Sequence, residues 1–360
     1  MDDPSLFDDP TAPAPARPAA DEVATALPTT APPTGGGPVD LRRPVDLRRP
    51  AAQAAKAEPD DPLAAALTGE GPALLAVDGN GLVHRAFHGY AEDPRGPLHG
   101  FMALLVGLVD QTAPEGIVVG FDCGTRSRRR EAWPDYKAHR PRHDPGVGQL
   151  LNSAARLLEA CGVTVARPEG LEADDVVASA ATAAEAAGWR ALVASSDRDV
   201  YATVSDRTVV LDWRRGIRRL EPITPARLRR DPGVRPEQYV ELAALRGDPS
   251  DNLPGVEGIG ASKAAELLAA YPTVEDAGAD PIGARSVLGR RAGRALLADL
   301  DRGEASVYRR NARLMALDRT VPVDPAACRR EASAEDVASA CEVAEVPAIA
   351  SRAAVALGRG

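Results

Sequence analysis

The chain has 360 residues, of which 44% are apolar and 26% are charged, and its formal net charge is −9. This length can support one large domain or two smaller ones, and no run of about 20 apolar residues is suited to crossing a membrane. The four cysteines are widely spaced without a CxxC pair, which argues against a structural zinc site or a disulfide framework. We therefore expect a cytoplasmic protein that does not enter the membrane.

The first 70 residues are rich in Pro, Ala, Thr and Gly and almost lack large apolar side chains. Such a segment buries too little surface to offset its ordering entropy, so we predict a disordered N-terminal extension over residues 1–70. Its tandem repeat PVDLRRPVDLRRP at 38–50 is interpreted as a low-complexity linker. A short basic docking arm is the alternative.

The folded part is expected to begin with the first of five short apolar runs, at 72–78, 116–122, 162–166, 189–195 and 208–212. Helix-like segments separate the runs, notably at 99–111, 147–161 and 173–187. Continuous apolar strands alternating with helices predict an α/β fold whose mostly parallel sheet is covered by helices on both faces. From about residue 236 the pattern is helical, and no strong strand is expected before residue 320.

Acidic residues gather at the strand ends and in three short motifs: Asp78, Asp122, Glu172, Asp174, Asp175, Asp197, Asp199, Asp248 and Asp251. Any one of them could be a turn former or a helix cap. As a group they are harder to explain, because three acids within residues 172–175 repel one another unless a cation is near. Oxygen-only ligation suits Mg²⁺ or Mn²⁺, and two such ions can promote phosphodiester hydrolysis. We therefore predict a divalent-metal site that hydrolyses a nucleic-acid backbone.

Two further features suit a nucleic-acid substrate. Basic residues follow Asp122 closely, over 126–142, and could draw phosphate toward the acids, although a basic run is more often a solvated face. The glycine-rich stretch 255–260 precedes a helix-like segment, an arrangement that lets backbone N–H groups approach a phosphate.

Five stretches carry a resemblance to a known family: VDGNGLVHRAFH (77–88), GFDCGTRSRRREAWPDYKAHRP (120–141), GLEADDVVA (170–178), SSDRDV (195–200) and GDPSDNLPGVEGIGASKAAELL (247–268). They resemble the 5′-nuclease family, which includes the 5′→3′ exonuclease domain of bacterial DNA polymerase I and the flap endonucleases. The resemblance covers about residues 72–322 and is closest to the stand-alone actinobacterial 5′-3′ exonuclease type, since the chain leaves no room for a polymerase module.

The resemblance implies a PIN-like α/β core over 71–235, with a helical arch at about 141–162. It also implies a helix–hairpin–helix DNA-binding subdomain over 236–322, which leaves 323–360 as a C-terminal helical tail. Pro145 and the glycines at 146 and 148 are expected to loosen the first part of the arch.

The resemblance further implies how the acids divide between two metals. Asp78, Asp122, Glu172 and Asp174 would hold one metal, and Asp174, Asp197, Asp199 and Asp251 the second. Asp175 and Asp248 would reach the metals through water. All nine acids of the pattern are present, and a binding-only relative would be expected to have lost at least one.

Basic residues receive roles in the same way. Lys137, Arg85 and Arg129 would act in catalysis beside Asp174, and the attacking water is expected to lose its proton near Lys137. Arg140 would bind DNA, and Tyr136 would stack on a terminal base, although an isolated Tyr is more often part of the core.

The resemblance implies that the helix–hairpin–helix contacts DNA through Gly255, Gly258, Gly260, Ser262 and Lys263. It also implies a K⁺ ion at this place. The family usually has Lys-Thr where this chain has Ser262-Lys263, which puts the lysine's phosphate contact in doubt.

The expected function is therefore metal-dependent 5′→3′ hydrolysis of double-stranded DNA, with endonuclease action on 5′ flaps. The expected partner is DNA with 5′ ends, nicks or flaps, bound by a monomer associated with the nucleoid. A PIN-like ribonuclease and a non-catalytic structure-specific DNA-binding module are the alternatives.

Overall fold

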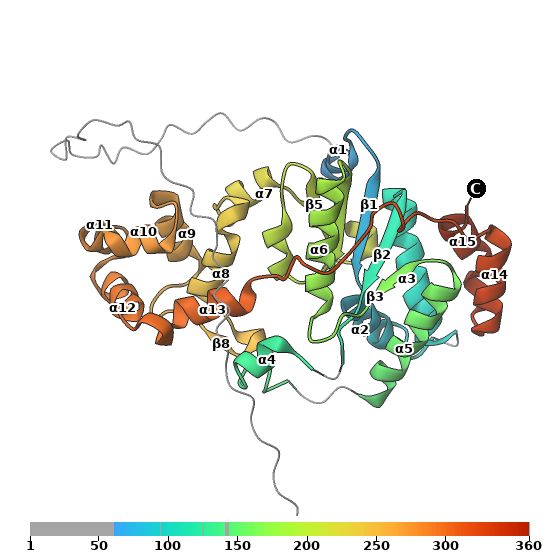
Figure 1. Ribbon diagram of the computed structural model, residues 1–360, viewed down its shortest axis with the longest axis horizontal. Helices are drawn as coiled ribbons and strands as arrows, with labels where there is room; N and C mark the ends of the chain where they lie inside the picture. Colours follow the sequence, from blue (N-terminus) through green and yellow to red (C-terminus); the bar gives the residue numbers. More distant parts are fainter. Residues whose placement is uncertain (1–60, 94, 125, 141–143, 360) are drawn as a thin grey trace, which may run out of the picture. The chain divides into compact units, whose positions relative to one another are not determined.

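The computed structural model describes residues 61–359 except 94, 125 and 141–143. The repeat at 38–50 and most of the predicted N-terminal extension therefore lie outside the described residues. A six-stranded sheet in the order β3-β2-β1-β4-β5-β6 organises the first half of the described chain (Figure 1). The strands β1 to β5 are parallel, and β6 pairs with β5 in the antiparallel sense.

All five predicted strands are confirmed, as β1 (Ala73–Asp78), β2 (Gly116–Gly120), β3 (Thr164–Ala166), β4 (Arg190–Ser195) and β5 (Thr208–Asp212). The sequence analysis missed β6 (Glu221–Ile223), a three-residue edge strand with a proline at its centre. Proline cannot donate to a ladder and weakens the strand pattern in a sequence. The basic segment 213–220 is the connection between the antiparallel pair β5 and β6.

Two hydrophobic cores lie on the two faces of the sheet because side chains alternate along each strand. In β1, Leu74 and Ala76 join one core with α6 (Ala173–Ala186), whereas Leu75 and Val77 join the other. The second core contains α2 (Gly79–Gly89), α3 (Gly96–Thr112) and α5 (Pro145–Ala160). The predicted coverage of both faces by helices is therefore confirmed.

The predicted disordered extension over residues 1–70 is too long, because residues 62–67 form a helix. Asp61 caps α1 (Pro62–Leu67), and its carboxylate accepts hydrogen bonds from two backbone N–H groups of the first turn at 3.0 Å. The Leu67 carbonyl accepts a 2.6 Å hydrogen bond from Arg190 at the start of β4. Residues 62–67 thus belong to the folded unit, and the boundary at 70 was wrong for them.

The second half of the described chain is mainly helical. The elements from 217 to 254 are η2 (Ile217–Arg219), α7 (Pro225–Arg230), η3 (Pro236–Gln238), α8 (Tyr239–Arg246), β7 (Gly247–Asp248), η4 (Pro249–Asp251) and β8 (Leu253–Pro254). They are followed by α9 (Ala261–Ala270), α10 (Val274–Ala279), α11 (Pro281–Leu288), α12 (Arg290–Leu300), η5 (Gly303–Ala305) and α13 (Val307–Met315). The two-residue strands β7 and β8 are the exception to the helical pattern predicted here.

The C-terminal tail packs against the helices on one face of the sheet. Its helices α14 (Ala334–Val343) and α15 (Pro347–Leu357) contribute Val337, Ile349 and Leu357 to the core that contains α3 and α5. Figure 1 shows both helices beside α3 and α5, on the side of the sheet away from α9–α12.

The structure corrects the expectation of a loosened arch. Pro145 is the first residue of α5, Asp144 caps it, and Val147 and Leu150 are buried against the core. A proline is favourable at a helix start, so residues 145–148 begin the helix instead of interrupting it. Residues 141–143 lie outside the described part, and within the described part no helix is long and apolar enough to span a membrane.

Candidate active site

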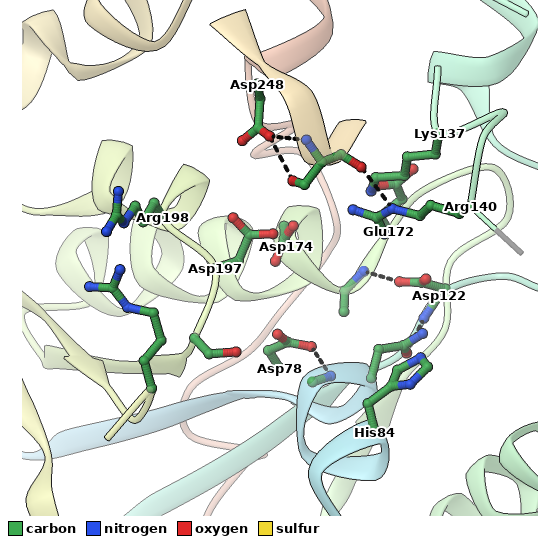
Figure 2. Close-up of a pocket in the computed structure, with 16 residues that line it drawn as sticks. Asp78, His84, Asp122, Lys137, Arg140, Glu172, Asp174, Asp197, Arg198 and Asp248 are labelled. Carbon is green, nitrogen blue, oxygen red and sulfur yellow. Dashed lines mark hydrogen bonds and ion pairs between the residues drawn. The ribbon is translucent and has the colours of Figure 1, made fainter. Parts of the chain in front are cut away.

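The candidate site lies where the strand order reverses. The chain runs outward from β1 through β2 to β3 and then returns to β4 on the other side of β1. Parallel sheets leave a crevice at the carboxyl ends of the strands on either side of such a point. A cavity of about 360 Å³ lies here (Figure 2), lined by Asp78, Asn80, Gly81, His84, Asp122, Lys137, Arg140, Glu172, Ala173, Asp174, Ser196, Asp197, Arg198, Arg214, Asp248 and Ser250.

Asp78 ends β1 and caps α2. Its carboxylate accepts a 2.8 Å hydrogen bond from the Gly81 N–H and a 2.9 Å bond from the Ser195 hydroxyl. A side chain at Gly81 would begin 2.6 Å from Asp78 Oδ2, so glycine is required there for the carboxylate to reach its place. The Ser195 hydroxyl also accepts a hydrogen bond from the Asp197 N–H at 3.0 Å, which ties the ends of β1 and β4 together.

Asp122 follows β2, and Glu172 and Asp174 stand at the start of α6. The Ala173 N–H donates to Asp122 Oδ1 at 2.9 Å, and the Asp122 N–H donates to the Asn80 side chain at 3.0 Å. Glu172 and Asp174 stand at the first turn of α6, where the helix dipole favours negative charge. These bonds fix the start of α6 against the end of β2.

The last acids reach the cavity from the helical half of the chain. Asp248 lines the cavity, and its Oδ1 accepts a 2.7 Å hydrogen bond from the Ser250 N–H. Asn252, in the left-handed region at φ 59°, completes the turn between β7 and β8. Asp251 is buried behind Asp248 and bonds to Arg140 at 2.6 Å.

The carboxylates destabilise one another's charge. Burial, together with the charges of Asp122 and Asp197, raises the pKa of Asp78 to about 6. Burial, together with the charges of Asp197 and Asp78, also raises the pKa of Asp174 well above its usual value. Burial and neighbouring carboxylates raise the pKa of Asp199 to about 8. A bound cation would relieve this repulsion.

Two basic side chains face the acids. Lys137 Nζ lies 2.7 Å from Glu172 and 3.9 Å from Asp251, and Arg140 also lines the cavity (Figure 2). Burial opposes the charge of Lys137, but the attraction of Glu172 and Asp251 outweighs it and raises the lysine pKa. The Lys137 ammonium therefore keeps its proton beside these acids and offsets part of their negative charge.

Two predicted residues belong to a separate ion cluster. Arg129 holds both oxygens of Asp175 at 2.6 and 2.7 Å, and its guanidinium also donates to the carbonyls of Leu314 and Ala316. Asp175 is fully buried, and its remaining bonds come from the Glu172 and Asp318 N–H groups. We name this the Arg129–Asp175 cluster. Neither side chain lines the cavity, but Arg129 Nη1 lies 3.7 Å from the cavity acid Glu172, so direct contact of Asp175 with a metal is not supported and the cluster acts on the cavity through Glu172.

Tyr136 is also misplaced by the sequence analysis. It is only 4% exposed, packs in the core beside α6, and donates from its hydroxyl to Glu172 at 3.2 Å. A buried ring cannot stack on a base, and the core role that competed with stacking is the one observed. Arg85 donates to the Trp213 carbonyl at 3.3 Å and lines a second cavity that shares Gly81 and Ser196 with the first.

The glycine-rich loop, residues 255–260, does not line the cavity that contains the acids. Gly258 has φ 74°, and Gly260 stands at the N-cap of α9 without a side-chain cap. Lys263 Nζ donates to the Gly258 carbonyl at 3.2 Å, and the Ser262 hydroxyl donates to Glu266. Gly255 packs where a side chain would begin 2.2 Å from the Arg246 carbonyl oxygen, so its glycine serves the fold.

Eight lining residues were not predicted as site residues, among them Asn80, His84, Arg198 and Arg214. Arg198 stands between two of the predicted acids, and Arg214 follows the strand β5 by two residues. The rule that located the acids, position at the carboxyl end of a parallel strand, would have found both arginines.

The donor set fits hard divalent cations, because the lining acids offer oxygen alone. Asp199 Oδ1 is buried without a hydrogen-bond partner in the part of the chain that the structure describes, which is unusual for a carboxylate. No three His, Cys, Asp or Glu side chains among the described residues form a ready-made ligand set for one ion.

Two family models match the chain. Residues 73–232 match the 5′-3′ exonuclease N-terminal resolvase-like domain, and residues 234–336 match the 5′-3′ exonuclease C-terminal SAM fold.

Curated relatives show the same similarity. DNA polymerase I of Mycobacterium tuberculosis is 40% identical over 208 residues, which are 56% of this chain and 23% of the relative. DNA polymerase I of Bacillus caldotenax is 34% identical over 209 residues, which are 56% of this chain and 24% of the relative. The chain thus spans about a quarter of the length of these relatives.

Solved structures agree on the fold. The T5 D15 protein co-crystallised with metal ions superposes with a TM-score of 0.57 at 20% identity, over 77% of this chain and 99% of that one. The catalytic core of Rad2 in complex with a DNA substrate gives a TM-score of 0.50 at 14% identity, over 82% and 94% of the two chains. At these identities the likeness supports the fold alone.

Proposed function

This chain belongs to the 5′-3′ exonuclease family, and we propose that it hydrolyses phosphodiesters of double-stranded DNA from 5′ ends and at 5′ flaps. The observation that carries the proposal is the convergence of six carboxylates and four cationic side chains on one cavity: Asp78, Asp122, Glu172, Asp174, Asp197, Asp248, Lys137, Arg140, Arg198 and Arg214. Six carboxylates alone would repel a phosphate, so they need a cation between them and the substrate.

The proposed cofactor is Mg²⁺ or Mn²⁺, with two ions in the cavity. Asp78, Asp122, Glu172 and Asp174 would hold one ion, and Asp174 with Asp197 the other, supported by Asp199 and Asp251 behind them. Bound there, the ions would supply Lewis-acid stabilisation of the attacking and leaving oxygens. K⁺ at the glycine-rich loop is part of the same proposal.

The chain's own residues would bind and orient the phosphate. Lys137 keeps its proton beside Glu172 and so can donate a hydrogen bond to a phosphate oxygen that gains charge in the transition state. Arg140 is held by Asp251, which fixes its guanidinium at the rim. The Gly258–Gly260 loop would hold the duplex through its backbone, without reading bases.

We further propose that the protein acts as a monomer at the nucleoid, in replication and repair. Bound DNA in the neighbouring Rad2 structure and the DNA polymerase I relatives support this placement. The test is a product-length assay on nicked, gapped and flapped 5′-labelled duplexes with Mg²⁺, Mn²⁺ or EDTA. We expect short 5′ products with either metal and none with EDTA. Cleavage of a matched RNA flap at the same rate would contradict the assignment to DNA.

A further inference from the structure

Arg198 lies on the side of the cavity away from Lys137 and Arg140. Figure 2 shows Arg198 on one side of Asp197 and Asp174, with Lys137 and Arg140 on the other. Arg198 and Arg214 both line the cavity and come from neighbouring strand ends, since Ser195 of β4 is in register with Asp212 of β5. Asp197 and Asp174 thus lie between Arg198 on one side and Lys137 and Arg140 on the other.

Arg214 is held in place by a buried partner. Its Nε donates to Asp212 at 2.6 Å and its Nη2 donates to the Tyr201 hydroxyl at 2.9 Å. Asp212 is only 2% exposed, so the anchor itself is rigid. These bonds leave Nη1 of Arg214 without a partner among the described residues.

Arg198 has no buried carboxylate partner of this kind among the described residues. It is exposed on the turn between β4 and η1 (Asp199–Thr203), and none of the described carboxylates forms an ion pair with it. Arg198 and Arg214 line the same cavity, so guanidinium donors of both can reach one anion bound there. Guanidinium donors match phosphate oxygens well because their fork geometry is fixed.

We propose that Arg198 and Arg214 form an anion subsite that binds a second phosphate group of the DNA strand while the scissile phosphate lies at the carboxylates. This subsite rests on the proposed function, because it positions the same substrate. Its ligand is either an internal phosphodiester or the terminal 5′-phosphate. The two share one chemistry, and the experiment separates them.

The test measures DNA binding in EDTA, where no cleavage occurs, on nicked duplexes that carry either a 5′-phosphate or a 5′-hydroxyl at the nick. Arg198→Ala should weaken binding about tenfold at low salt and lower the slope of log Kd against log salt by about one. Arg215→Ala, an exposed neighbour that does not line the cavity, is the matched control and should change affinity less than twofold.

The two duplexes identify the phosphate. Equal losses on both assign the subsite to an internal phosphodiester, and a loss confined to the 5′-phosphate duplex assigns it to the terminus. Arg214→Gln should show the same loss, and Arg198→Glu takes its place if Arg214→Gln fails to fold. Affinities and salt slopes of Arg198→Ala and Arg198→Glu that equal those of Arg215→Ala would overturn the subsite. A wild type that binds through Arg198 but does not cleave in Mg²⁺ would overturn the proposed function alone.

Discussion

Two adjacent carboxylates at the start of α6 have opposite surroundings. Asp174 lines a cavity in which burial and other acids raise its pKa, whereas Asp175 is fully buried and holds Arg129 through both oxygens. The cavity therefore holds like charge that Lys137 and the lining arginines offset only in part, whereas in the Arg129–Asp175 cluster the two charges pair directly. Within one short motif, Asp174 thus lowers the stability of the metal-free protein and Asp175 raises it.

Asp174→Ala gives the largest expected effect on activity. Loss of an oxygen ligand shared by both proposed ions should reduce cleavage by about 10³-fold or more, since each tenfold loss corresponds to about 1.4 kcal/mol of transition-state stabilisation. Cleavage is measured on a 5′-labelled nicked duplex, and binding is measured in EDTA. The metal-free variant should also melt at a higher temperature than the wild type, because one repelling charge is gone. Wild-type rates in Mg²⁺ would rule out the two-ion assignment.

Asp175→Ala should act on stability instead. Removing it leaves the Arg129 guanidinium buried and unpaired, which costs about 3–5 kcal/mol of the free energy of unfolding. Urea denaturation followed by circular dichroism measures this loss. The double variant Arg129→Met with Asp175→Ala removes both charges and should recover part of it. A stable but inactive Asp175→Ala protein would show that the residue acts on the metals.

The metal-free protein should lose stability as the pH rises. The folded-state pKa values of Asp78 and Asp199, about 6 and about 8, exceed the ordinary value of 3.8. The folded form therefore binds more protons than the unfolded form, and the free energy of unfolding falls between pH 4 and pH 8. The shift of Asp78 alone corresponds to about 3 kcal/mol. Urea midpoints in EDTA across this range measure the fall, and an increase would contradict the repulsion.

Lys137→Ala should slow turnover by about 10²-fold and weaken DNA binding far less, because the ammonium acts mainly on charge that develops in the transition state. Single-turnover rates and binding in EDTA separate the two effects. Lys137→Arg keeps the charge and should retain part of the rate. Equal losses in rate and affinity would reduce Lys137 to a simple phosphate contact.

Deletion of the N-terminal extension should have the smallest effect. Removing residues 1–60 should leave activity and melting temperature unchanged. Removing 1–70 also deletes α1 and its bond to Arg190, which should lower the melting temperature by a few degrees. A large loss of activity in the shorter deletion would show that the extension takes part in the reaction.

Sequence patterns located the strands and the cavity because both depend on local periodicity and on where strands end. The patterns could not separate Asp174 from Asp175, or recognise Tyr136 as core, because burial depends on the partners that tertiary packing brings. Arg129, for example, contacts carbonyls near residue 315, about 185 positions along the chain. The edge strand β6 was missed for a local reason, its central proline. Arg198 and Arg214 follow strand ends as the acids do, so the sequence could have predicted them as cavity residues.

The segment that carries Lys137 has a further consequence. The Lys137 N–H bonds to the Asp251 carbonyl at 3.0 Å, Arg140 bonds to Ser250 and Asp251, and Arg129 reaches Ala316. Lys137, Arg140 and Arg129 are therefore held by residues that are synthesised long after them. A growing or truncated chain that ends before them would contain most of the acids without a placed Lys137. The proposed site would therefore be complete only after residue 251 has been synthesised, and the Arg129 contact only after residue 316.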